Sequence, residues 1–108
     1  MARFNAVPRE AYMETEDQDI GTIDIIKVAA SSRTSAVAGA IAGVFRENQH
    51  VEVQAIGASA VNQSVKALAL AKGYLAEDGY DIVFVPYFVD VDIDGKLRTA
   101  IKFTVDSR

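Results

Sequence analysis

The sequence predicts one α/β domain, an α+β two-layer sandwich of βαβαββ order, over residues 22–108. Residues typical of strands gather in four segments, and apolar residues recur at helical spacing in two others. Asp94-Gly95 separates the last two strand segments, which is a typical hairpin signal. The chain has 108 residues, half of them hydrophobic, which suits a single domain with a buried core.

The first half of the domain begins with a strand over residues 23–29, which are rich in isoleucine and valine. A polar loop of helix N-cap residues, 31–35, follows it. A helix is predicted over residues 35–48, because four apolar residues share one of its faces. They are Val37, Ile41, Val44 and Phe45. Gly39 and Gly43 indicate that another backbone packs close to this helix, either the domain's own sheet or a second subunit.

A second strand and helix follow in the same order. Residues 51–56 alternate apolar and polar side chains and predict a strand. After Gly57, a helix is predicted over residues 59–72, ending at Gly73, a natural residue for a helix end. A right-handed crossover makes the first two strands parallel. Both helices are therefore expected on one face of a four-stranded mixed sheet.

The last two strands are predicted over residues 80–92 and 96–105, and the loop between them has two alternatives. Asp94-Gly95 suggests a two-residue type I′ turn. A three-residue loop, residues 93–95, shifts the register by one residue and exchanges the faces of a strand. The longer loop is favoured, with Gly95 in the left-handed position of a G1 bulge.

The favoured register sets apolar residues opposite one another, with Val91 facing Leu97. On the other face it sets acids opposite bases. These pairs are Asp92 with Lys96 and Asp90 with Arg98. Part of the positive charge of the hairpin is therefore expected to be neutralised.

The composition excludes several classes of site. The absence of cysteine excludes a disulfide framework, a thiolate zinc site and a cysteine nucleophile. The only histidine, His50, lies in a predicted loop and is given no role. No apolar run approaches the ~18 residues of a membrane span, and residues 1–21 lack the apolar region of a signal peptide. We therefore expect a cytoplasmic protein. Association with the nucleoid is compatible with this expectation.

Most of the net charge of −4 lies near the N-terminus. Residues 1–21 hold five acids against two bases, whereas residues 22–108 hold ten acids and nine bases. Residues 1–21 show no clear period and are predicted to form a flexible acidic extension. The domain itself is almost neutral, unlike a strongly basic nucleic-acid binder.

Two segments imitate known motifs and fail at identifiable positions. Asp90-x-Asp92-x-Asp94-Gly95 resembles the start of an EF-hand loop, but Ile101 stands at the twelfth position in place of a glutamate. Residues 57–61, GASAV, lack the last glycine of a serine-hydrolase turn. No catalytic residue, metal site or cofactor is therefore predicted. The loops before the two helices could hold phosphate on backbone N–H groups, although ordinary capping is the simpler interpretation.

Several blocks of sequence are specific when they are taken together. They are Lys27-Val28-Ala29-Ala30, residues 35–40, 53–58 and 61–67, and a hairpin containing Ile93-Asp94-Gly95 and residues 98–102. These blocks resemble the stage V sporulation protein S family over essentially all of residues 23–108. The resemblance implies an Alba-like fold with sheet order 1-2-4-3, which agrees with the element order predicted above. It also implies a homodimer or higher homo-oligomer that binds DNA or RNA and regulates bacterial development.

By position, the resemblance places nucleic-acid contacts in three patches and on one strand residue. They are Ser31, Ser32 and Arg33 in the first loop, Asn62, Gln63 and Lys66 on the second helix, Lys96, Arg98 and Lys102 in the hairpin, and Lys27. The family has a lysine where Ser31 stands, so the basic contact in this loop falls to Arg33. Because the domain has few bases, binding is expected to be weak and salt-sensitive.

Three hypotheses about function follow. The first is a non-enzymatic regulator that binds nucleic acid, which the resemblance favours. The second is an oligomeric protein-interaction or scaffold module without nucleic-acid binding, which the near-neutral charge favours. The third is a site for a small phosphorylated ligand at the helix N-termini. No membrane partner is expected.

Overall fold

The computed structural model describes residues 12–15 and 24–108. In these residues two helices and five strands follow one another along the chain. They are β1 (Tyr12–Thr15), β2 (Asp24–Val28), α1 (Thr34–Asn48), β3 (His50–Ala55), α2 (Ala58–Glu77), β4 (Ile82–Ile93) and β5 (Lys96–Ser107). From β2 onward the order is βαβαββ, so the predicted fold class is confirmed.

The strands form one mixed sheet in the order β1-β2-β3-β5-β4. β2 and β3 are parallel, and the other neighbouring pairs are antiparallel. The four strands from β2 to β5 therefore have the sheet order 1-2-4-3 that the resemblance implies. β1 was not expected and extends the sheet beside β2, with Met13 opposite Ile26. The other residues of the predicted extension, 1–11 and 16–21, lie outside the described residues.

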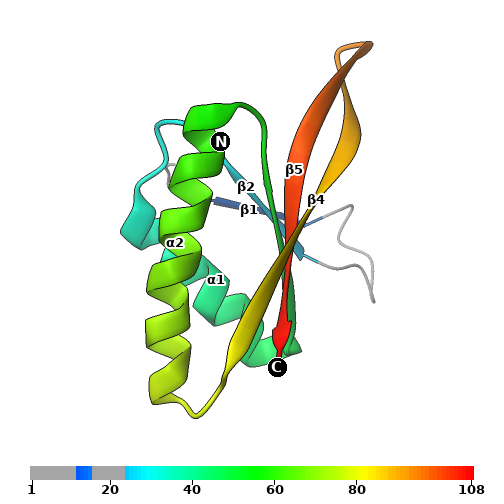
Figure 1. The fold of residues 1–108 in the computed structure, drawn as a ribbon. Helices are drawn as coiled ribbons and strands as arrows, with labels where there is room; N and C mark the ends of the chain where they lie inside the picture. Colours follow the sequence, from blue (N-terminus) through cyan, green and yellow to red (C-terminus); the bar gives the residue numbers. More distant parts are fainter. Residues whose placement is uncertain (1–11, 16–23) are drawn as a thin grey trace.

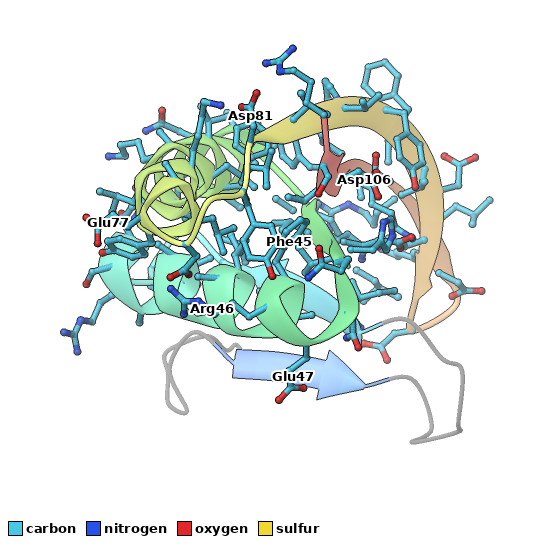
Figure 2. All side chains as sticks on the ribbon, turned by 90° about the horizontal axis from the view of Figure 1, so that it is seen from below. Phe45, Arg46, Glu47, Glu77, Asp81 and Asp106 are labelled. Carbon is cyan, nitrogen blue, oxygen red and sulfur yellow. The ribbon has the colours of Figure 1, made fainter. Side chains whose placement is uncertain are left out.

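Both helices cover the same face of the sheet, and the core lies between these two layers (Figure 1). Every second residue of β3 is buried, because one face of this central strand meets the helices. All four apolar residues predicted for the buried face of α1 are buried. One of them, Phe45, lies between the helices and the sheet (Figure 2) and packs edge-on to Tyr80, with ring centroids 5.2 Å apart.

The glycines of α1 do not mark close packing inside the domain. Gly39 and Gly43 are exposed, and a Cβ added at either position would meet no described atom within 4 Å. The interpretation that the domain's own sheet packs closely against them is therefore wrong.

The predicted end of α2 at Gly73 is also wrong, since the helix continues to Glu77. Leu75 is fully buried, and its packing outweighs the cost of about 1 kcal/mol for an exposed glycine within a helix. The helix ends in a Schellman motif. Gly79, with φ of 89°, donates its N–H to Ala76, and the Tyr80 N–H reaches the carbonyl of Leu75.

The predicted register of the β4–β5 hairpin is wrong by one residue. Ile93 pairs with Lys96, so the turn has two residues, Asp94 and Gly95, with φ of 52° and 82°. Both values belong to a type I′ turn. The Asp92 carboxylate supports this turn by accepting the Gly95 N–H at 2.9 Å. The prediction failed because it assumed a buried face near the tip, where Leu97 is in fact 73% exposed.

The observed register changes the charge pattern of the hairpin. Val91 lies opposite Arg98 and Asp90 lies opposite Thr99, so the acids and bases point to different faces. Asp90 and Asp92 share the face that meets the helices lower down the sheet. Lys96 and Arg98 share the other face. The predicted neutralisation of these bases by directly opposite acids is therefore wrong.

Candidate nucleic-acid interface

The loop between β2 and α1 presents one base and is closed by an internal turn. Ser32 is buried, and its Oγ accepts the Ala29 N–H at 2.9 Å. Its backbone N–H also donates to the Ala29 carbonyl at 3.0 Å. Ser32 therefore shapes the loop, whereas Ser31 and Arg33 on either side of it are exposed.

The first turns of both helices have no side-chain cap. Arg33 is the N-cap residue of α1 and Gly57 that of α2, and neither makes a side-chain capping hydrogen bond. The interpretation of the polar loop as a source of capping side chains is therefore wrong for α1. Arg33 itself is exposed at this uncapped helix start.

Gln63 joins α2 to this loop. Its Nε2 donates to the Ser32 carbonyl at 2.7 Å and to Thr34 Oγ1 at 3.3 Å. Gln63 was predicted to contact nucleic acid, and its observed partners make it a residue that positions the loop. Asn62 and Lys66 on the same helix are exposed.

Lys102, predicted as a contact, belongs to a network on the helix-free face of the sheet. Its Nζ lies 3.2 Å from Glu52 Oε1, and both side chains are largely buried. Glu52 Oε2 lies 3.5 Å from His50 Nε2, and His50 Nδ1 lies 2.6 Å from Asp106 Oδ1. Lys102 is therefore neutralised by Glu52.

The same network gives His50 a role that the sequence prediction missed. The hydrogen bond to Asp106 raises the pKa of His50, partial burial opposes this change, and Glu52 reinforces it. The available signal was the alternation of polar residues on β3, whose partners on β5 include Asp106 and Lys102.

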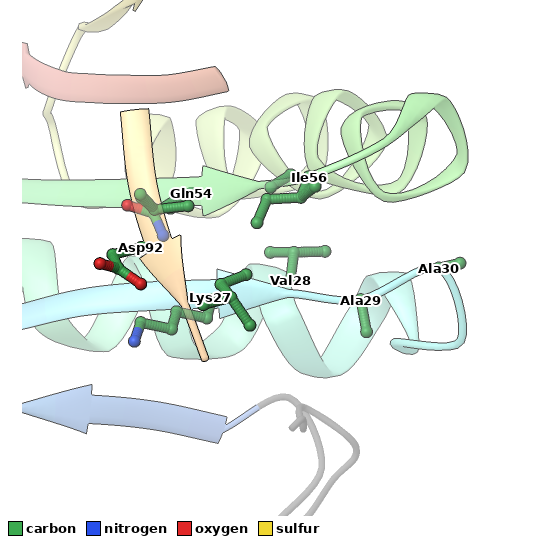
Figure 3. Close-up of a pocket in the computed structure, with 10 residues that line it drawn as sticks. Lys27, Val28, Ala29, Ala30, Gln54, Ile56 and Asp92 are labelled. Atoms are coloured by element: carbon green, nitrogen blue, oxygen red, sulfur yellow. The ribbon is translucent and has the colours of Figure 1, made fainter. Parts of the chain in front are cut away.

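Lys27 lies beneath the hairpin tip, away from the exposed surface of the loop. It lines an open pocket of about 470 Å³ between the ends of β2 and β3 and the tip of β4. Gln54 and Asp92 also line this pocket (Figure 3). Lys27 is half-buried and is not without an interaction partner.

Apart from Lys27, the described bases divide into two groups according to their partners. Four pair with carboxylates: Arg46 with Asp78, Lys72 and Arg108 with Asp81, and Lys102 with Glu52. Four others are exposed and form no ion pair with any described residue. They are Arg33, Lys66, Lys96 and Arg98, and we call their surface the basic end.

The basic end comprises Arg33 before α1, Lys66 near the middle of α2, and Lys96 and Arg98 in the hairpin. The β2–α1 loop and the hairpin tip both lie in the upper part of Figure 1, with the first turns of α2 between them in this view. Arg46 and Asp81 lie at the opposite end, which is viewed directly in Figure 2. The β2–α1 loop and the hairpin tip therefore lie away from the ion pairs of Arg46 and Asp81.

Within residues 12–15 and 24–108, no group of three histidine, aspartate or glutamate side chains is arranged to hold a metal ion. Neither α1 nor α2 is long and apolar enough to cross a membrane.

Comparison with known protein families matches residues 24–108 to the family of stage V sporulation protein S, SpoVS. The match spans every element from β2 to β5 and every residue of the basic end. The family is regulatory and non-catalytic, which supports a sporulation-related regulatory role. The chain therefore belongs to the stage V sporulation protein S family.

Proposed function

We propose that this chain is a cytoplasmic, non-enzymatic regulator that binds DNA or RNA through its basic end and acts as a homo-oligomer. One observation carries this proposal. The four exposed bases without a carboxylate partner in the described residues lie on the β2–α1 loop, α2 and the hairpin, whereas Arg46 and Asp81 lie at the opposite end of the fold from the hairpin tip.

The near-neutral total charge does not oppose such binding, because charges act over short distances in salt. α2 has 20 residues and is therefore about 30 Å long. This length is about three Debye lengths at 0.1 M ionic strength. The carboxylates near the C-terminal end of α2 are thus largely screened from a phosphate backbone at the basic end.

The hairpin register adds to the argument. Lys96 and Arg98 share the face of β5 that points away from Asp90 and Asp92. A phosphate that approaches this face meets two bases before it meets either carboxylate. Arg33 and Lys66 add two further contacts from the loop and from α2.

The proposal is tested by fluorescence anisotropy with labelled duplex DNA and duplex RNA over a salt series. We expect Arg33→Ala/Lys66→Ala to weaken binding about tenfold or more at ~0.1 M salt, because two phosphate contacts are lost. The matched control is Arg46→Ala/Lys72→Ala, which removes the same charge from the opposite end and should retain binding. Equal losses in both double variants would contradict an interface at the basic end.

A second candidate is an oligomeric interaction module that binds no nucleic acid. Large apolar side chains exposed on the hairpin favour it, with Phe88 at 75% and Leu97 at 73% exposure. The same anisotropy series separates the two candidates, since a pure interaction module gives no binding at ~50 mM salt, where electrostatic contacts are strongest.

A further inference from the structure

The pocket that Lys27 lines beneath the hairpin tip has a polar side and an apolar side. Its volume of about 470 Å³ lies within the range of about 300–1,000 Å³ that is usual for small-molecule sites. In Figure 3, Lys27 and Gln54 lie toward one side of the pocket, and Ile56 lies toward the other. The larger apolar residues of its lining are Val28, Ile56, Val91 and Ile93. Such a lining suits a flat ligand that forms hydrogen bonds at one edge and packs its faces against apolar side chains.

Gln54 is the polar residue of this pocket that is left to bind a ligand. Its side chain is half-buried and forms no hydrogen bond or ion pair with any residue in the described part of the chain. The other polar lining residues are engaged, since Asp92 accepts the Gly95 N–H and Lys27 is not without a partner. A glutamine amide carries an acceptor oxygen and a donor nitrogen side by side. It therefore matches a ligand that presents a donor next to an acceptor.

Two bases of the basic end border the apolar lining on the hairpin. In the β4–β5 ladder, Ile93 lies opposite Lys96, and Val91 lies opposite Arg98. Directly opposite residues of an antiparallel pair carry their side chains on the same face, with Cβ atoms about 4.5–5.5 Å apart. The apolar side chains from β4 and the two bases therefore share one face of the hairpin. A strand of nucleic acid whose phosphates contact these bases runs next to the pocket.

We propose that this pocket binds one unpaired adenine base of a nucleic-acid strand, while Lys96 and Arg98 hold the neighbouring phosphates. The inference rests on the proposed function and adds recognition of a base to an interface that otherwise contacts phosphates. The amino group of adenine lies between two ring acceptors, N1 and N7, so each polar edge matches the amide of Gln54. The pair of hydrogen bonds to N6 and N7 is the usual glutamine contact with adenine. Guanine presents two acceptors at N7 and O6, and there the amide satisfies only one.

The base has to be unpaired because the pocket lies inside the fold rather than on a protruding surface. A paired base is stacked within the duplex, and proteins that bind a base in a pocket use a single strand or extrude the nucleotide. An unpaired base instead exposes both its edges and its faces. Its faces would pack against Val91 and Ile93 of the hairpin and against Ile56. A bulged or single-stranded adenine is therefore expected to bind more tightly than a continuous duplex.

Fluorescence anisotropy with the full chain tests the pocket on two labelled duplexes that differ at one nucleotide. One carries a central adenine bulge, and the other carries an abasic bulge at the same position. Both have the same number of phosphates, so counterion release contributes equally to their binding. We expect the adenine bulge to bind about tenfold more tightly at ~0.1 M salt, because it adds two hydrogen bonds, each worth about two- to tenfold in affinity.

Two protein variants assign this preference to Gln54. Gln54→Leu removes the amide and keeps a side chain of similar size, so it should reduce the preference for adenine at least about threefold. Its affinity for the abasic duplex should stay at the wild-type value. The matched control is Thr104→Val, at a half-buried polar position on the same face of the sheet but outside the pocket, which should keep the full preference. A Gln54→Leu variant that keeps the full preference would overturn recognition by this amide.

Nuclear magnetic resonance observes the same contact without relying on affinity. The side-chain Nε2–H resonances of Gln54 should shift when the adenine-bulge duplex is added and should stay in place with the abasic duplex. Equal affinity for the two duplexes, with no shift of these resonances, would overturn the base pocket and leave the proposed function intact. Absence of binding to both duplexes at ~50 mM salt would contradict the basic end and this pocket with it.

Discussion

Gln63 holds Ser32 in place across 31 residues of sequence, since its side-chain Nε2 donates to the Ser32 carbonyl at 2.7 Å. This bond fixes the loop that carries Arg33 to the helix that carries Lys66. Two bases of the proposed interface are therefore set relative to each other by one amide side chain.

Substitution of Gln63 should loosen this loop. Gln63→Ala removes a part-buried hydrogen bond and should lower the free energy of unfolding by about 1 kcal/mol. Amide hydrogen exchange in residues 29–35 should accelerate, and nucleic-acid affinity should fall without a change in net charge. Asn62→Ala, on the exposed neighbour, is the control and should leave the hydrogen exchange of residues 29–35 unchanged. Unchanged exchange in Gln63→Ala would contradict the positioning role.

His50 should make stability depend on pH. Its pKa is raised in the folded state by Asp106, so the protonated imidazole stabilises the fold. This contribution is complete below the unfolded pKa of about 6.5 and is lost as pH rises through the higher folded pKa. Urea unfolding from pH 5 to 9 should show this loss in the wild type. His50→Gln should remove it, and a variant that keeps the full pH dependence would assign the effect to another group.

Two glycines near the end of α2 should respond in opposite directions to alanine. Gly73 is exposed inside the helix and has space for a Cβ, so Gly73→Ala should stabilise the protein by about 1 kcal/mol. Gly79 has φ of 89°, so Gly79→Ala should destabilise it by about 1–2 kcal/mol. Chemical denaturation measures both. Stabilisation by both substitutions would place the helix end elsewhere.

The two faces of the hairpin should differ in their effect on binding. Lys96→Ala/Arg98→Ala removes two bases from one face and should reduce the salt slope of binding by about 2. Asp90→Asn alters the other face and should leave the slope unchanged. The measurement is the dependence of the binding constant on salt for each variant. A slope that changes as much for Asp90→Asn would favour the register in which acids and bases share a face.

The fold was predictable where apolar patterns face a core. Val37, Ile41 and Phe45 occur at helical spacing, and burial enforces that pattern in the structure. The apolar pattern gave a wrong prediction where the side chains are not buried. Near the hairpin tip, Leu97 has no core to face, so the backbone preference of Asp94 and Gly95 for left-handed φ decides the register.

The ends of elements were predicted less well for a related reason. Gly73 is a strong local stop signal, yet the burial of Leu75 against the core extends α2 beyond it. Whether the stop signal of Gly73 or the burial of Leu75 prevails depends on a contact with the core that is distant in sequence, so local sequence does not decide where the helix ends. β1 likewise depends on pairing with β2, which no local pattern in residues 12–15 indicates.

The sequence named candidate site residues, but it did not predict which of their side chains have partners within the fold. Arg33 and Lys66 are exposed as a contact requires, whereas Ser32 and Gln63 have internal partners. Lys102 is paired with Glu52 across neighbouring strands. Side-chain partners of this kind depend on strand register, and the sequence alone did not define them.

The salt dependence of binding tests the central claim most directly. Each phosphate contact contributes about −0.9 to the slope of log K against log salt on duplex DNA. The four bases of the basic end therefore predict a slope of about −3.6 per bound protomer. The measurement is anisotropy with one duplex between ~50 and ~200 mM salt, over which affinity should fall about 100-fold. No binding at ~50 mM salt, or a slope near zero, would contradict a nucleic-acid interface at the basic end.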